Sequence, residues 1–410
     1  MIAFHFPPAR GSGVQRTLSF CRDLPEFGWQ AEILSAHPRA FPSQGHEQLA
    51  DIPAQLNVKR AFALDAAKDL SVAGRYLRIT ASPDRWANWQ LWAVPAAMAM
   101  IKQQRPQVIW ATYPIATSLL IAHTLHKKTG IPWVADFRDP MICNTLPEDP
   151  SIRKTFGKVE KQSVESCQRA ITTTHSHRQL LQERYPLIEN ARWQVVANGY
   201  DEPIFKEVEE NLPAKQKNRK ITLLHSGTLY TGQENRDPRP FFSAIAKLRQ
   251  EQRLDPDTIE IIFRATGQDQ EIQGIIDSAG VDDMVQIKPT LAYRDAVEEM
   301  FLVDGLLLLQ GRNYNYQVPA KLFEYLRTRR PLLALTDQEG DSARIMREAG
   351  VTTIAPMHDE KIIARSFMQT ITNIKTENSS PSTQTSLEHL SRRARAKELA
   401  QVLDQLGEDN

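Results

Sequence analysis

Residues 305–335, GLLLLQGRNYNYQVPAKLFEYLRTRRPLLAL, place two short apolar runs on either side of an amphipathic stretch. The runs Gly305–Leu309 and Leu332–Leu335 have the length and composition of buried strands, and Lys321–Thr328 has the pattern of a helix. A strand, a helix and a second strand in this order are typical of a parallel β-α-β unit. This stretch therefore predicts an α/β fold.

The same alternation of apolar runs and helical patterns extends over most of the chain. In a first series, strands are expected at Ile2–Phe6, Ala31–Ser35, Val108–Thr112, Trp133–Asp136, Ala170–Thr174 and Gln194–Ala197. In a second series, they are expected at Ile221–Ser226, Ile259–Ala265, Val285–Lys288, Gly305–Leu309, Leu332–Leu335 and Thr352–Ile354. Two such series predict two Rossmann-like domains with parallel sheets.

The chain length also supports two domains, because 410 residues exceed the ~100–200 residues of one ordinary domain. We expect the first domain at residues 1–200 and the second at 221–384. Residues 201–220 are charged and lack an apolar period, so we interpret them as the linker. Residues 385–410 are expected to form a helix that packs back toward the first domain. Because such sheets bind ligands at their strand carboxyl ends, we expect the two domains to face each other across a cleft.

Composition excludes several functional classes. A formal net charge of +1 argues against a nucleic-acid-binding protein, which normally shows a basic excess. Cys21, Cys143 and Cys167 are far apart and have no metal-ligand spacing, which indicates reduced thiols in a cytoplasmic protein. No stretch approaches the ~20 apolar residues that cross a bilayer.

Three tryptophans follow one another at helical spacing. Trp86, Trp89 and Trp92 lie in residues 83–104 and would share one face of a helix. Packing in the core is the simpler interpretation. A patch that faces a membrane or an acceptor is the alternative, because tryptophan favours interfaces.

The segment FPPARGSGVQR, residues 6–16, contains a glycine loop between a predicted strand and a helix that starts near Val14. Gly11 and Gly13 would let the backbone approach a ligand, and the helix N-terminus would offer amides to an anion or a hydroxyl. A simple tight turn is the alternative. The pattern of three spaced glycines is absent, which argues against a nicotinamide cofactor.

The segment ADFRDP, residues 135–140, follows an apolar strand with three charges. Asp136, Arg138 and Asp139 are costly to bury unpaired, so they should line a cleft or pair with one another. In the functional interpretation, one carboxylate positions a sugar hydroxyl or polarises an acceptor.

A second glycine turn follows the first strand of the second series. The segment HSGTLY, residues 225–230, is followed by Arg236, which could bind a diphosphate through bidentate hydrogen bonds. A solvated arginine is the alternative. His225 is interpreted as the end of the strand and not as a base.

The most informative segment is YQVPAKLFEYL, residues 316–326. Pro319 fits a helix start, and Lys321, Glu324 and Thr328 would share one face of that helix. The helix N-terminus and Lys321 suit a pyrophosphate, and Glu324 could accept both ribose hydroxyls. A surface Lys–Glu pair is the alternative.

Together, these segments resemble the retaining GT-B glycosyltransferases of family 4, which build bacterial cell-surface polysaccharides. The resemblance covers nearly the whole chain through FPPARGSGVQRT, PWVADFRDP, HSGTLY and PAKLFEYLRTRRPLLAL. It implies catalytic roles for Asp136, Arg138, Asp139, Arg236 and Lys321. It implies substrate-binding roles for Gly11, Ser12, Gly13, Arg16, Gly227, Thr228, Tyr230, Val285, Pro319, Lys321 and Glu324.

The implied reaction is transfer of a sugar, with retention, from a UDP-, GDP- or dTDP-sugar to a glycan or lipid-linked glycan. No acidic pair with metal spacing stands near the predicted donor site, so we expect no divalent cation, and we expect no cofactor. The resemblance places the enzyme in the cytoplasm, with peripheral contact to the inner membrane face as a further expectation.

Two positions depart from the family pattern. Tyr316 stands where the first of two glutamates is usual, and Thr228 stands where an arginine is usual. They leave open a degenerate GT-B scaffold subunit that binds a nucleotide sugar without turnover. A non-hydrolysing sugar-nucleotide epimerase of the same architecture is a third hypothesis.

Overall fold

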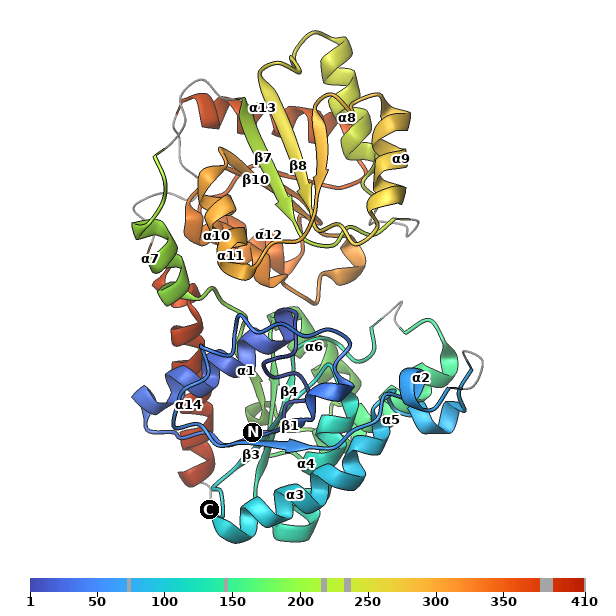
Figure 1. Ribbon diagram of the computed structural model, residues 1–410, viewed down its shortest axis with the longest axis vertical. Helices are drawn as coiled ribbons and strands as arrows, with labels where there is room; N and C mark the ends of the chain where they lie inside the picture. Colours follow the sequence, from blue (N-terminus) through green and yellow to red (C-terminus); the bar gives the residue numbers. More distant parts are fainter. Residues whose placement is uncertain (72–74, 144–146, 215–219, 232–236, 377–385, 409–410) are drawn as a thin grey trace. The chain divides into compact units, whose positions relative to one another are not determined.

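The computed structural model describes residues 1–71, 75–143, 147–214, 220–231, 237–376 and 386–408. The chain divides into two compact units (Figure 1). The first unit contains residues 1–198 and 392–410, and the second contains residues 199–391. Both are built on parallel sheets with helical crossovers, so the predicted α/β fold is confirmed.

The sheet of the first unit has two parts. Its strands are β1 (Ile33–Ala36), β2 (Val58–Ala61), β3 (Ile109–Thr112), β4 (Trp133–Phe137), β5 (Arg169–Thr172) and β6 (Trp193–Val195). Strands β1 and β2 pair with each other, and β3 to β6 pair in sequence order. Ile2 joins the two parts, because it forms parallel bridges to both Leu34 and Ala111.

The expected strand Ile2–Phe6 is therefore reduced to a single bridging residue. The amide of Ala3 still donates to Leu34 at 3.1 Å, but the chain then leaves the sheet. Pro7 and Pro8 follow, and neither has an N–H for a strand ladder. Strand β2 was not predicted, because its four residues include two charged side chains, as is common at a sheet edge.

The helices of the first unit cover its sheet. They are α1 (Ser12–Asp23), α2 (Ala66–Asp69), α3 (Gln90–Gln103), α4 (Ala116–Thr129), α5 (Pro150–Ser166), α6 (His175–Arg184) and α14 (Arg392–Glu408). Helix α14 comes from the C-terminal end of the chain and packs its apolar side chains with Phe20, Trp110 and Val134.

The three tryptophans do not share one face of a helix. Trp86 precedes a short 3-10 helix, Ala87–Trp89, and Trp92 lies in α3. Trp86 and Trp89 are buried beside Phe4, with ring centroids 4.7 and 5.3 Å away. Trp92 is 38% exposed, so only two of the three belong to the core.

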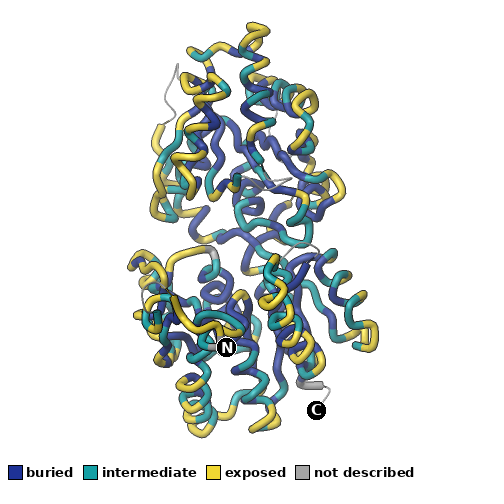
Figure 2. The backbone as a smooth tube through the Cα atoms, turned by 90° about the vertical axis from the view of Figure 1, so that its right-hand side faces the viewer, coloured by how far each residue is buried: buried dark blue, intermediate teal, exposed yellow. Residues whose placement is uncertain are grey.

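The second unit contains one six-stranded parallel sheet in the order β12-β11-β10-β7-β8-β9. Its strands are β7 (Ile221–Ser226), β8 (Ile259–Arg264), β9 (Val285–Lys288), β10 (Gly305–Leu309), β11 (Leu332–Leu335) and β12 (Ile354–Ala355). Its helices are α7 (Glu202–Glu210), α8 (Arg239–Gln250), α9 (Asp269–Ala279), α10 (Tyr293–Leu302), α11 (Ala320–Thr328), α12 (Asp341–Glu348) and α13 (Glu360–Lys375). Within each unit the strands are mostly buried and the outer helical faces are exposed (Figure 2).

The segment 201–220, expected as a linker, contains helix α7. Phe205 on this helix is fully buried, and its ring lies 5.8 Å from that of Phe301. Arg327 forms ion pairs with both Glu202 and Glu209. These contacts make α7 part of the second unit. The helix was not predicted from the sequence, because its many charged residues outnumber the few apolar residues of its buried face.

Within the described residues, no helix combines the length and the hydrophobicity that a membrane-spanning segment requires.

Candidate functional site

The glycine loop of the first unit leads directly into α1. Gly11 is the residue before the helix and has φ 111°, in the region that favours glycine. It offers no side-chain acceptor to the first turn of the helix. The N-terminus of α1 is therefore a suitable place for backbone amides to meet a ligand. Gly11, Ser12 and Gly13 all lie at this turn.

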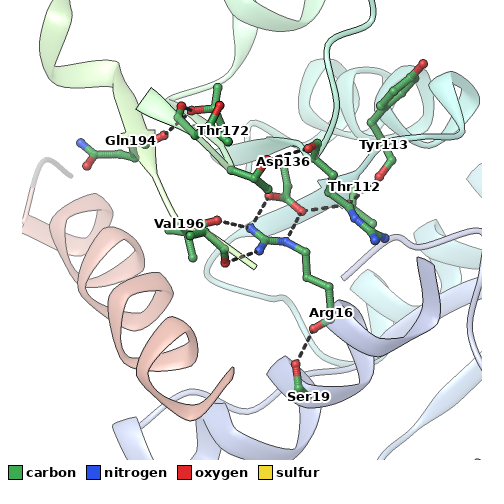
Figure 3. Close-up of polar contacts among 12 residues, drawn as sticks. Arg16, Ser19, Thr112, Tyr113, Asp136, Thr172, Gln194 and Val196 are labelled. Carbon is green, nitrogen blue, oxygen red and sulfur yellow. Dashed lines mark hydrogen bonds and ion pairs between the residues drawn. The ribbon is translucent and has the colours of Figure 1, made fainter. Parts of the chain in front are cut away.

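Arg16 and Asp136 form a bidentate ion pair in the interior of the first unit (Figure 3). The distances are 3.0 Å from Nε to Oδ2 and 2.8 Å from Nη2 to Oδ1. Thr112 Oγ1 also donates to Oδ2 of Asp136, at 2.8 Å. The guanidinium donates further to the carbonyl oxygens of Val196 and Ala197, both at 2.9 Å.

This pair joins α1 to the carboxyl ends of three strands. Arg16 is 5% exposed and Asp136 is 0% exposed, and both carboxylate oxygens already accept hydrogen bonds. The arrangement favours a structural role for the two residues. We therefore reinterpret the substrate-binding role expected for Arg16 and the catalytic role expected for Asp136.

Arg138 contacts the glycine loop. Its Nη1 donates to the carbonyl oxygen of Gly13 at 2.7 Å, and Thr173 Oγ1 donates to the Arg138 carbonyl at 2.7 Å. Burial raises the pKa of the neighbouring Asp139, and the charge of Arg138 opposes that increase. Both side chains are half-buried, and the hydrogen bond to Gly13 places Arg138 beside the loop.

His5 is a further residue at this turn. A Cβ atom placed on Gly13 would lie 3.7 Å from both His5 Cδ2 and Arg138 Nη1. Burial, with smaller effects from Arg138 and Arg85, lowers the pKa of His5 to about 4, so its ring is neutral at pH 7. Among the described residues, its Nδ1 atom has no hydrogen-bond partner. Its position at the end of the first apolar run was the signal that could have identified it.

The glycine turn after β7 holds the side chain of Lys321. Gly227 has φ 127°, and a Cβ atom placed on it would lie 2.4 Å from Lys321 Nζ. The amide of Gly227 donates to the carbonyl oxygen of Arg264 at 2.9 Å. The structure therefore brings together two predicted residues that are far apart in the sequence.

Lys321 lies in the first turn of α11, which begins directly after Pro319. Burial lowers the pKa of Lys321 to about 8, although the charge of Glu324 acts in the opposite direction. Its ammonium lies 3.5 Å from His225 Nε2.

Glu324 is 8% exposed, and Tyr293 Oη donates to its Oε1 atom at 2.8 Å. Tyr293 is the first residue of α10 and was not predicted as a site residue. The pair links the helix that carries Lys321 to the helix that follows β9.

A buried amide holds the loop that precedes α11. Gln310 Nε2 donates to the carbonyl oxygens of Tyr314 and Gln317, at 2.9 and 2.7 Å. Ser342 Oγ donates to the oxygen of the same amide at 2.5 Å. These bonds fix the loop that contains Tyr316. Gln310 was also missed, although it directly follows an apolar strand.

Val285, to which the resemblance assigns a substrate-binding role, lies in β9. It is the first residue of β9 and is packed in the core, whereas Lys288 ends the strand at its carboxyl end. At the equivalent end of β8, Arg264 pairs with Glu299 and donates to the Pro289 carbonyl oxygen at 2.6 Å. Residues 288–289 therefore lie at the carboxyl end of β9, and the substrate-binding role expected for Val285 stays a prediction.

The other residues predicted to bind substrate after β7 are either exposed or outside the described residues. Thr228 is exposed, and Tyr230 is 45% exposed. Arg236 lies outside the described residues, so its expected contact with a diphosphate stays a prediction. Among the residues that the structure describes, no cluster of three or more histidine, cysteine or acidic side chains could hold a metal.

Comparison with known families matches the first half of the chain to a glycosyltransferase domain. Residues 11–199 match the model of a glycosyl transferase 4-like domain. No curated protein sequence matches the chain.

Solved structures of three enzymes share the fold over nearly the whole chain. Sucrose-phosphate synthase from Thermosynechococcus elongatus has a TM-score of 0.68 at 14% identity, covering 100% of this chain and 98% of that chain. An alpha,alpha-trehalose-phosphate synthase (UDP-forming) from Burkholderia xenovorans, in complex with glucose-6-phosphate, has a TM-score of 0.69 at 9% identity, covering 98% of each chain. UDP-GlcNAc 2-epimerase from Neisseria meningitidis, bound to UDP-GlcNAc, has a TM-score of 0.56 at 12% identity, covering 100% of this chain and 99% of that chain. These similarities confirm the predicted GT-B fold.

Proposed function

We propose that this chain is a glycosyltransferase that transfers a sugar from a nucleotide diphosphate sugar to a hydroxyl of a glycan or lipid-linked glycan, because residues 11–199 match a glycosyl transferase 4-like domain and the whole chain shares the GT-B fold. In this proposal the sugar keeps its anomeric configuration, and the product belongs to a surface polysaccharide.

The contact between Lys321 and Gly227 is the observation that carries the donor site. Transfer of the sugar leaves a nucleoside diphosphate, and the enzyme must stabilise the negative charge that develops on it. A half-buried ammonium at the N-terminus of α11, beside a turn without a side chain, offers charge and backbone amides to that group.

Glu324 extends the donor site toward the nucleoside. Its carboxylate lies on the same helix as Lys321 and is oriented by Tyr293. A carboxylate is suited to accept hydrogen bonds from two ribose hydroxyls. The similar synthase is described as UDP-forming and the similar epimerase as bound to UDP-GlcNAc, so UDP-sugars are the first donors to test.

The glycine loop of the first unit carries further residues to which we assign a role. We assign Gly11 and Gly13 to the transferred sugar, and Arg138 and Asp139 to the acceptor side. We nominate no protein nucleophile: in retaining GT-B enzymes the departing phosphate oxygen is thought to deprotonate the acceptor on the same face. Arg138 binds the loop through Gly13, so it would also keep the loop in place.

An exposed aromatic pair supports peripheral contact with the inner face of a membrane. Trp92 and Phe62 are 38% and 36% exposed and meet with their ring centroids 4.7 Å apart. The Arg39 guanidinium lies 4.8 Å from the Phe62 ring. Aromatic rings next to a cation are suited to the interface of an anionic bilayer.

Turnover with UDP-, GDP- and dTDP-sugars tests the donor assignment, with Lys321→Ala and Glu324→Ala as site variants. We expect each variant to weaken donor binding by at least ~10-fold, or 1.4 kcal/mol. Arg327→Ala removes another cation of α11 that pairs with α7, and it serves as the control. Donor affinity equal to that of the wild type in both site variants would refute the assignment.

The same assay separates the competing activities. Donor binding without turnover for every acceptor would indicate a scaffold subunit. Conversion of UDP-GlcNAc to an epimer without an acceptor would indicate an epimerase. Transfer to glucose-6-phosphate in place of a glycan would correct the proposed acceptor class.

A further inference from the structure

His225 has a fixed orientation in the interior of the second unit. It is the fifth of the six residues of β7 and is 0% exposed. Its Nδ1 atom lies 2.9 Å from the carbonyl oxygen of Leu307 on the neighbouring strand β10. A carbonyl oxygen can only accept, so Nδ1 carries the proton and donates it.

The other ring nitrogen faces Lys321. With the proton on Nδ1, Nε2 carries a lone pair, and this atom lies 3.5 Å from Lys321 Nζ. Within the part of the chain that the structure describes, it is the only hydrogen-bond partner of the Lys321 ammonium. Burial, and then the charge of Lys321, lowers the pKa of His225 well below its usual value, so the ring is neutral.

Gly227 limits where the ammonium can lie. Because a Cβ atom at this position would be 2.4 Å from Nζ, the lysine uses the space that a side chain would fill. His225, two residues earlier in the chain, contacts the same ammonium through Nε2. The two features together define one position for Nζ.

We propose that His225 is a positioning residue for Lys321, whose ammonium it holds beside Gly227 for the diphosphate of the donor. This proposal rests on the proposed function of Lys321 and adds a residue to it. The resemblance to family 4 gave His225 no such role.

A neutral acceptor suits this position better than an acidic one. A carboxylate at the same distance would form an ion pair with Lys321 and compete with the diphosphate for it. An imidazole without charge orients the ammonium and leaves its full charge for the ligand. Its rigid ring, fixed by Leu307, also restricts the movement of the flexible lysine chain.

Two amide variants separate the two hydrogen bonds of His225. In His225→Asn, the amide nitrogen lies near the place of Nδ1 and can still donate to Leu307, but the side chain is too short to reach Lys321. In His225→Gln, the amide oxygen lies near the place of Nε2 and can accept from Lys321. We expect kcat/KM for the donor to fall at least ~10-fold in His225→Asn, and to stay within ~3-fold of the wild type in His225→Gln.

The opposite order, with His225→Asn active and His225→Gln impaired, would show that only the bond to Leu307 matters, and it would overturn the proposal. Thermal unfolding of both variants checks that they fold, and UDP, GDP and dTDP binding by calorimetry gives a readout without turnover.

A double-mutant cycle with Lys321→Ala distinguishes this proposal from the one on which it rests. If His225 acts through Lys321, His225→Asn has no further effect on donor kcat/KM in the Lys321→Ala background. If Lys321→Ala itself binds and uses the donor like the wild type, the proposed function of Lys321 fails. If Lys321→Ala is impaired and His225→Asn is not, only the positioning role fails.

Discussion

Lys321 Nζ lies 2.4 Å from the position that a Cβ atom of residue 227 would occupy. Gly227→Ala should therefore displace the ammonium or the turn. Its φ of 127° adds strain for any residue with a side chain, about 1–3 kcal/mol. We expect donor affinity to fall at least ~10-fold, together with a lower melting temperature. Calorimetry with the accepted nucleoside diphosphate and thermal unfolding measure the two effects.

Gly274→Ala is the matched control for this prediction. Gly274 lies inside α9, and a Cβ atom there would meet nothing within 4 Å. Alanine in a helix interior is favoured over glycine by roughly 0.5–1 kcal/mol, so this variant should be slightly more stable and bind donor normally. Normal donor binding by Gly227→Ala would show that Lys321 does not need its present position.

Donor use should depend on pH through Lys321. Burial lowers the pKa of this lysine from 10.5 to about 8, and only the protonated form attracts a diphosphate. Below pH 8 the ammonium is present and kcat/KM for the donor is high. Above pH 8 kcat/KM should fall as the proton is lost, approaching tenfold per pH unit.

Lys321→Arg tests the origin of this decrease, because a guanidinium stays protonated throughout the range. This variant should have a lower kcat/KM for the donor than the wild type, and its kcat/KM should no longer fall above pH 8. A decrease that remains unchanged in Lys321→Arg would have to come from another group.

Local patterns were sufficient to predict most of the strands and the donor helix. Gly227 follows one apolar strand and Lys321 opens a helix after another, and neighbouring parallel strands end on the same edge of a sheet. Their proximity could therefore be inferred without coordinates. Helix α7 could not, because its buried Ile204 and Phe205 are too few for a visible apolar period.

Side-chain pairing was less predictable than the fold. The sequence left open a pair between Arg138 and a neighbouring carboxylate, because these residues are adjacent. In the structure Asp136 instead pairs with Arg16, which is 120 residues earlier. Spacing along the chain identifies sequence neighbours, but it does not identify a partner on another element, such as Arg16 on α1.

Trp89 and Trp92 should respond differently to truncation. Trp89 is 0% exposed and lies against Phe4, so Trp89→Ala should lower the free energy of unfolding by about 3–5 kcal/mol. Trp92 is 38% exposed, so Trp92→Ala should cost about 1 kcal/mol or less. Urea denaturation measures both effects. Equal costs would show that the two tryptophans share one environment, as the spacing in the sequence first indicated.

Trp92→Ala also tests the proposed membrane contact without disturbing the core. The variant should bind anionic vesicles several-fold more weakly in a sedimentation assay, because it removes one ring of the exposed pair. Leu187→Ala is the control. Leu187 is 96% exposed, but it lies in the segment between α6 and β6 and not in this aromatic pair. Vesicle binding that is equal in the wild type and both variants would contradict a contact at this surface.

The Arg16–Asp136 pair should contribute to stability and not to chemistry. Asp136→Ala leaves the guanidinium of Arg16 buried without its carboxylate, and such a change typically costs about 3–5 kcal/mol. Replacing both partners, as in Arg16→Met with Asp136→Leu, removes both charges and should recover most of that loss. Urea denaturation of the single and double variants forms a double-mutant cycle. If the pair is structural, donor turnover per folded molecule returns with stability in the double variant. If Asp136 acts on the substrate, the double variant folds but stays inactive, because a leucine can neither accept a hydrogen bond nor polarise a hydroxyl.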